Sequence, residues 1–168
     1  TISGNIAHYD YGGAYYSVMN NCVLSANTSA RMAGGAYHSQ CVNCTIVSNN
    51  APSGSGVRVC WLTNCIISGN TGGAAVGAGS QLFNCLVSDN ATLGVYNSGL
   101  VNCTVVGNNG GVDNSGLNNC IVWSNKNYNI IEPFECFNTC APDISTSNGC
   151  INYNPMFVDA ANGNYRLQ

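Results

Sequence analysis

The chain has 168 residues, of which 45% are hydrophobic, and this is enough for one domain with a buried core. The net charge is −3 and no run of lysine or arginine occurs, which argues against nucleic acid and against an anionic membrane surface as partners. Only 7% of the residues are charged, so asparagine, serine, glycine, threonine and tyrosine must form the surface.

The N-terminal stretch TISGNIAHYD lacks the positive region and the apolar run of a signal peptide. No stretch of 18 apolar residues follows it, so we expect no direct membrane insertion. Its first five residues, Thr1 to Asn5, repeat the end of the later stretch CIISGN. We therefore expect them to be the second half of a coil, covered either by flanking coils of a longer chain or by a second copy stacked end to end.

Six similar segments follow between Gly12 and Asn125, each with a cysteine directly after an asparagine. The interval between successive cysteines shortens from 22 residues to 17, while the positions from nine before each cysteine to five after it align without gaps. All variation in length then falls in the loop before the next glycines. The repeated pairs are Asn21 and Cys22, Asn43 and Cys44, Asn64 and Cys65, Asn84 and Cys85, Asn102 and Cys103, and Asn119 and Cys120.

Around each cysteine, apolar and polar residues alternate over three or four positions, which is typical of a short strand. No helical spacing is sustained, and glycine and asparagine at this density oppose a helix. The sequence therefore predicts an all-β fold, a single-stranded parallel β-helix (β-solenoid) of about seven coils. We expect residues 1–125 to form the coils, with the first one incomplete, and residues 126–168 to form the last coil and an irregular C-terminal segment.

Coils about 4.8 Å apart place like residues above one another. We expect the asparagines that precede the cysteines to form an inward structural ladder of paired amides, and the six cysteines that follow them to form an inward stack. Of four N-x-S/T sequons, those at Asn43 and Asn102 fall in this ladder, so only Asn27 and Asn90 could carry a glycan, and only in a host that glycosylates. These two belong to another asparagine column, five residues after each cysteine.

The motifs GGA before the strands and asparagine after them resemble those of bacterial right-handed parallel β-helix repeat proteins, in particular polymorphic outer-membrane proteins and related secreted surface proteins. The resemblance covers Gly12 to Asn125, and the tail NPMFVDAANGNYRLQ looks like the segment that ends such helices. It implies a right-handed β-helix and an extracellular or cell-surface location. It implies no particular activity, because this scaffold carries adhesins, lyases, hydrolases and fibres.

Most of the 11 cysteines fall in the coil columns, where parallel Cβ vectors disfavour a disulfide, so we expect free thiols there. Cys136, Cys140 and Cys150 lie outside these columns, and one disulfide among them is predicted, with its pairing open. A zinc site at these three is disfavoured because no histidine lies near them. We expect no metal and no cofactor.

The seven acidic residues fall in different columns, so no carboxylate pair for glycoside hydrolysis and no catalytic residue is predicted. Tyr15, Tyr37 and Tyr96 share a column with Arg58 that we expect to face water, where it forms a weak binding surface for carbohydrate or a protein partner. The column is broken by Ala78, and tyrosine is common in strands, so a purely structural role stays open.

We therefore predict a non-catalytic, extracellular structural or adhesive β-helix, either a module of a larger surface protein or a subunit of a head-to-tail filament. The low charge favours such packing, since few like charges oppose it. The alternative is a carbohydrate-binding or polysaccharide-cleaving β-helix. It would use a lateral groove formed by the longer loops before Gly13, Gly35 and Gly56.

Overall fold

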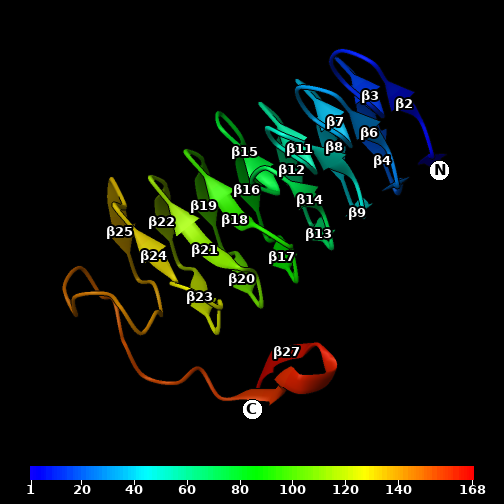
Figure 1. Cartoon of the computed structure of the whole chain (residues 1–168). Helices are drawn as coiled ribbons and strands as arrows, with labels where there is room; N and C mark the ends of the chain where they lie inside the picture. The colour runs from blue at the N-terminus through cyan, green and yellow to red at the C-terminus, as the bar shows by residue number, and fades with distance from the viewer.

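The computed structural model describes residues 1–168, which form a solenoid of short parallel strands (Figure 1). Three sheets of seven strands each run along its axis, and a fourth sheet of four strands joins them in the coils with the longest loops. Each strand pairs in parallel with its counterparts in the coils before and after it. The predicted all-β parallel β-helix of about seven coils is confirmed.

The strands are named here by sheet, in the order of the coils. Sheet 1 consists of β3 (Ala14–Tyr15), β7 (Ala36–Tyr37), β11 (Val57–Arg58), β15 (Val76–Gly77), β18 (Leu93–Tyr96), β21 (Gly110–Asp113) and β24 (Ile130–Ile131). Sheet 2 consists of β4 (Val18–Asn20), β8 (Gln40–Val42), β12 (Trp61–Thr63), β16 (Gln81–Phe83), β19 (Gly99–Val101), β22 (Gly116–Asn118) and β25 (Glu135–Phe137). Sheet 3 consists of β1 (Ile2–Ser3), β5 (Val23–Ser25), β9 (Thr45–Val47), β13 (Ile66–Ser68), β17 (Leu86–Ser88), β20 (Thr104–Val106) and β23 (Ile121–Trp123). Sheet 4 consists of β2 (Ile6–Ala7), β6 (Thr28–Ser29), β10 (Asn50–Ala51) and β14 (Thr71–Gly72).

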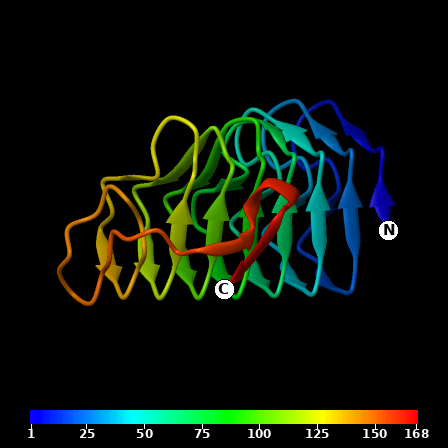
Figure 2. The ribbon, with the colours of Figure 1, turned by 90° about the horizontal axis from the view of Figure 1, so that it is seen from below.

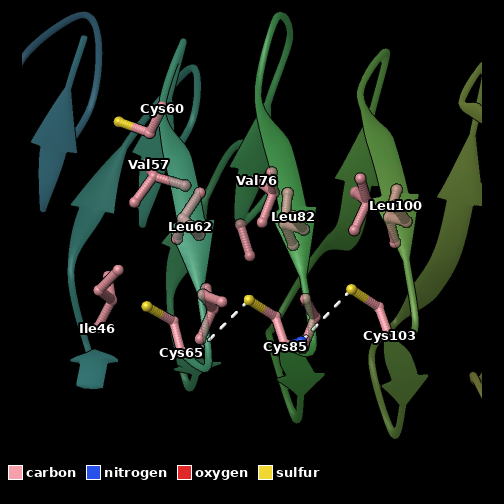
Figure 3. Close-up of a cluster of buried hydrophobic side chains, with 14 of the residues drawn as sticks. Ile46, Val57, Cys60, Leu62, Cys65, Val76, Leu82, Cys85, Leu100 and Cys103 are labelled. Carbon is pink, nitrogen blue, oxygen red and sulfur yellow. Dashed lines mark hydrogen bonds between the residues drawn. The ribbon is translucent and has the colours of Figure 1, made fainter. Parts of the chain in front are cut away.

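The core is a set of apolar columns, one from each of the three long sheets. Strands of two or three residues turn a single side chain inward, because side chains alternate between the faces of a strand. Leu62 of sheet 2, for example, lies between Cys41 and Leu82 of the neighbouring coils. Figure 3 shows how these side chains meet inside the solenoid. Stacking of like on like therefore fills the interior without any helix.

Three corners separate the sheets in each coil, and each corner holds a residue with positive φ. In the third repeat these residues are Val59 (φ 54°), Asn64 (φ 53°) and Gly69 (φ 60°). The residue after each corner is small and buried: Cys60, Cys65 and Asn70. Glycine and asparagine accept this left-handed conformation more easily than other residues, which explains their frequency at corners.

The fourth repeat contains one residue more than the ungapped alignment allows. The alignment set Gly77 beside Val57, whereas β11 and β15 pair Val57 with Val76 and Arg58 with Gly77. The extra residue is absorbed before β16, in a turn where Gly79 has φ 82°. Length variation is thus not confined to one loop, because the strands on both sides of this turn are held in register by the neighbouring coils.

The last coil continues through β24 and β25 to Cys140, which bridges to Ile121 on one side and to Ile151 on the other. Beyond it, β26 (Phe157–Asp159), the 3-10 turn η1 (Ala160–Asn162) and β27 (Asn164–Leu167) form an antiparallel hairpin. This hairpin lies beside sheet 3, where Figure 2 shows it crossing the coils. The structure contains no helix with the length and hydrophobicity needed to cross a membrane.

Candidate functional site

Five rings form one cluster near the N-terminal end of sheet 1, here called the aromatic cluster: Tyr11, Tyr15, Tyr16, Tyr37 and His38. The ring of Tyr11 is stacked on Tyr15 and on Tyr37, with centroids 4.6 and 4.3 Å apart. Tyr16 is stacked on His38 at 4.2 Å and meets Tyr15 edge to face at 4.8 Å. Tyr15 and Tyr16 nevertheless remain 51% and 64% exposed. The cluster is therefore contiguous and open to solvent.

The coil register positions these rings. Tyr15 and Tyr37 are paired in β3 and β7, so their side chains leave the same face one coil apart. Tyr16 and His38 follow them at the corner, with φ of 47° and 51°, and the Tyr16 hydroxyl lies 3.5 Å from Nε2 of His38. Tyr11 comes from the loop before β3, where its N–H donates to the carbonyl of Met32. Two coils and one loop thus build the surface.

A charged pair borders the cluster. A nitrogen of Arg31 lies 3.5 Å from a carboxylate oxygen of Asp10, and Asp10 is largely covered while Arg31 is exposed. The other Asp10 oxygen is buried without a hydrogen-bond partner. Desolvation, and then the nearby Tyr37 and Asp10, raise the pKa of Tyr11, so its hydroxyl stays protonated and able to donate. The site thus combines an aromatic surface with an exposed guanidinium at its edge.

Of the four residues predicted to share the binding column, three lie in consecutive coils. Arg58 pairs with Tyr37 and donates to the Ser53 hydroxyl, while its Nε is buried without a partner. Tyr96 is separated from them, because Gly77 and not Ala78 occupies the column in the coil between. A side chain at Gly77 would collide with the backbone of Gly54, so the loop covers this position and divides the column.

The aromatic cluster also holds three residues that the sequence reasoning did not select. Tyr16 and His38 occupy equivalent positions in two segments, 22 residues apart, and this repeated ring could have indicated that the two side chains stack. It was missed because a corner residue breaks the alternation of a strand, so its direction could not be assigned. Tyr11 precedes the aligned columns, and nothing in its spacing pointed to the rings of Tyr15 and Tyr37.

The asparagines before the cysteines form a ladder, but it faces solvent and not the core, so the predicted inward orientation was wrong. Each occupies a left-handed corner, which points its side chain outward and the following cysteine inward. The side chain of Asn64 donates to Asn43 at 3.2 Å, and Asn84 donates to Asn64 at 3.3 Å. The same bonds continue through Asn102 to Asn119, whereas Asn21 makes none of them. We call this row the exposed ladder.

The inward ladder is the other asparagine column, five residues after each cysteine. Asn70, for example, is fully buried and donates to Asn90 at 3.0 Å, and its own Oδ1 accepts from both the backbone N–H and the side chain of Asn49. The expectation that Asn27 and Asn90 are the accessible sequons is therefore wrong, since both are buried here. The members of this buried ladder are Asn27, Asn49, Asn70, Asn90, Asn108 and Asn125.

All eleven cysteines are free thiols, and three of the stacked ones, Cys65, Cys85 and Cys103, accept a backbone hydrogen bond. The N–H of Cys65 donates to Sγ of Cys85 at 3.4 Å, and that of Cys85 donates to Sγ of Cys103 (Figure 3). Of the stack, Cys22 is partly exposed and the other five are buried. Burial raises the pKa of the Cys60 thiol, in the serine column, to about 11, so it stays protonated at neutral pH. From Cys44 to Cys103 the stack is thus joined by hydrogen bonds as well as by the packing of small side chains.

Of the three C-terminal cysteines, two lie close together and the third is hydrogen-bonded elsewhere. Sγ of Cys136 lies 3.7 Å from Sγ of Cys150, whereas the Cys140 thiol donates to the carbonyl of Tyr153 at 3.1 Å.

Among the acidic residues, Asp113 pairs with Tyr96 in sheet 1, and the Asp143 carboxylate accepts the N–H of Asn129 at 2.9 Å. No group of three His, Cys, Asp or Glu side chains lies close enough to hold a metal ion.

No protein-family model matches the sequence, and no curated protein does, so the resemblance to polymorphic outer-membrane proteins stays a prediction. Among solved structures, the A-module of the mannuronan C-5 epimerase AlgE4 from Azotobacter vinelandii is similar in part. That match has 15% sequence identity and a TM-score of 0.26, and it covers 82% of this chain but 43% of the epimerase module. A likeness at this level does not bear on activity.

Proposed function

We propose that this β-helix is a non-catalytic adhesive protein that holds a polysaccharide through the aromatic cluster. The observation that carries the proposal is the contact of five rings on one face, with two of them more than half exposed. Exposed aromatic groups that gather in one place are a mark of a binding surface. Their apolar rings and polar hydroxyls suit sugars, which present both kinds of surface.

The regularity of the coil supports an extended ligand. Successive coils repeat the aromatic pair, Tyr15 with Tyr16 and then Tyr37 with His38, along the solenoid axis. The exposed guanidinium of Arg31, which is paired with Asp10, adds a charged hydrogen-bond donor at the edge. The adhesive role implies an extracellular or cell-surface location, either as a module of a larger surface protein or as a subunit of an end-to-end filament.

The test is retention on immobilised neutral and acidic polysaccharides. Replacing Tyr15 with Thr and Tyr16 with Asn removes two exposed rings and keeps the strand and corner conformations, since Asn97 and Asn114 already occupy corners with φ of 45° and 46°. We expect the affinity to fall about tenfold or more, which corresponds to about 1.4 kcal/mol. Tyr96→Thr, the isolated tyrosine of sheet 1, is the matched control and should bind normally.

Two outcomes contradict the proposal. If the wild-type chain is retained by no polysaccharide, or if the double variant binds as well as Tyr96→Thr, the aromatic cluster is not the binding surface. Incubation of the same polysaccharides with the protein, followed by measurement of new chain ends and of unsaturated products, tests the non-catalytic part. Release of either product would show an enzyme.

A further inference from the structure

We propose that Cys136 and Cys150 are a redox-active pair that forms one disulfide and closes the C-terminal end of the solenoid, while Cys140 stays a thiol. Their sulfur atoms are 3.7 Å apart. A disulfide requires about 2.05 Å between sulfurs, so closure needs a movement of less than about 2 Å. This inference is independent of the proposed polysaccharide binding.

The backbone around the pair already holds both residues in place. Cys136 is the middle residue of β25 and pairs with Leu117 of β22. Cys150 lies beside the same coil, because the N–H of the next residue, Ile151, donates to the carbonyl of Thr139 at 2.9 Å. Cys140 is the third cysteine, and its thiol faces away toward the carbonyl of Tyr153. The geometry thus selects one of the three pairings.

The arrangement of the two side chains differs from that of the stacked thiols, although stacked cysteines such as Cys103 and Cys120 also line a cavity. Cys136 and Cys150 line a cavity of about 490 Å³ together with Glu132, Phe134 and Asp143, so a small oxidant has a route to the sulfurs. In the coils the cysteines stand one above another, with side chains directed the same way. A stacked pair must twist to reach the disulfide dihedral, whereas Cys136 and Cys150 come from different columns.

The reaction with a small disulfide such as oxidised glutathione is balanced. Cys136 and Cys150 give up two protons and two electrons as their S–S bond forms, and glutathione takes up both and leaves as two thiols. Burial, and then the hydrogen bond with Cys150, raise the pKa of Cys136 to about 12. Because the thiolate is the attacking form, we expect the reaction to be slow at pH 7 and faster as the pH rises.

Peptide mapping identifies the pair. After oxidation and alkylation, chymotrypsin and a protease that cleaves before aspartate give three separate peptides, Glu135–Phe137, Asn138–Pro142 and Asp143–Tyr153. We expect the first and third to be linked and the second to carry the alkyl group on Cys140. Alkylation of all three cysteines after exposure to oxidised glutathione at pH 8.5, or linkage of Cys140, would overturn the proposal.

A thermal measurement on the whole chain supplies a second readout. Oxidation of the wild type and of Cys140→Ser should raise Tm by about 5 °C, because the closed loop restricts the unfolded chain. Cys136→Ser and Cys150→Ser should show no such rise. An equal rise in the Cys150→Ser variant would contradict the assignment even if that variant is less stable at the start.

Discussion

The exposed and the buried asparagine ladders occupy opposite sides of the same wall, six residues apart in each repeat. Asn64 stands at a left-handed corner, its backbone takes φ 53°, and its amide bonds only to neighbours in its own row. Asn70 is fully buried, and its amide donates to Asn90 and also to the carbonyls of Ile46 and Ser68. Asparagine thus has two different roles. In the exposed ladder it accepts a left-handed backbone conformation, and in the buried ladder its amide satisfies hydrogen bonds within the core.

The two ladders also run in opposite directions. In the exposed ladder each coil donates to the coil before it, as Asn84 does to Asn64. In the buried ladder each coil donates to the coil after it, until Asn125 donates to Asn129 and the N–H of Asn129 donates to Asp143. The buried row therefore ends on a carboxylate, which is the favourable partner for a series of N–H donors that point the same way.

Removal of one buried rung should have the largest effect. Asn70→Ala leaves the N–H and the side chain of Asn49 without their acceptor inside the core. We expect the free energy of unfolding to fall by about 3 kcal/mol, since unsatisfied buried groups cost about 1–3 kcal/mol each. Urea unfolding followed by circular dichroism measures it. A loss below about 1 kcal/mol would mean that the buried ladder contributes little.

Alkaline pH tests the buried columns through their thiols, since asparagine does not titrate. The thiol of Cys60 ionises near its ordinary value of 9.0 when unfolded and at about 11 when folded. Above pH 9 the unfolded chain therefore loses a proton that the folded chain keeps, and stability should fall by roughly 2 kcal/mol toward pH 11.

Cys60→Ser is the control for this measurement. Serine already occupies the same column at Ser39 and Ser80 and accepts the same N–H bonds. Its hydroxyl does not ionise in this range, so the alkaline loss should be smaller than in the wild type. The two proteins are compared by their unfolding midpoints between pH 8 and pH 11, and an identical decline in both would contradict the role of this thiol.

Substitutions in the exposed ladder should have the smallest effects. Asn64→Ala forces alanine into a left-handed corner and should cost about 1 kcal/mol. Asn64→Gly should cost close to nothing, because glycine accepts this conformation freely, although the bonds to Asn43 and Asn84 are lost in both variants. The urea midpoints of the two variants separate the contribution of the backbone conformation from that of the side-chain hydrogen bonds. An equal loss in the two variants would assign the stability to the amide bonds.

The sequence was sufficient for the fold because the same residues recur in the same order in all six segments, and stacked strands one coil apart explain that recurrence. The sequence was not sufficient to tell which side chains point into the core and which point to solvent. Asn64 and Cys65 are adjacent and equally repeated, and both were expected inside, yet a left-handed corner between strands sends one out and one in. Strand alternation is a rule for extended backbone, and it does not extend across a corner.

The candidate site was predictable only in part for a related reason. Tyr15 and Tyr37 lie in strands, where spacing alone places them on one face. Tyr96 belongs to the same column, as predicted, but the ungapped count placed Ala78 between it and Arg58, whereas the extra residue before Ser80 puts Gly77 there. Tyr11 joins the cluster through a loop whose path depends on contacts along the axis and not on any local pattern.

The turn at Gly79 shows that a coil can lengthen while its neighbours stay in place. Each strand is fastened to the coils on both sides, so the circumference of a coil and its pitch are independent quantities. A foreign peptide grafted at this turn should therefore be displayed at a fixed position along the axis. Strand pairing with the neighbouring coils sets that position, and the inserted peptide does not change it.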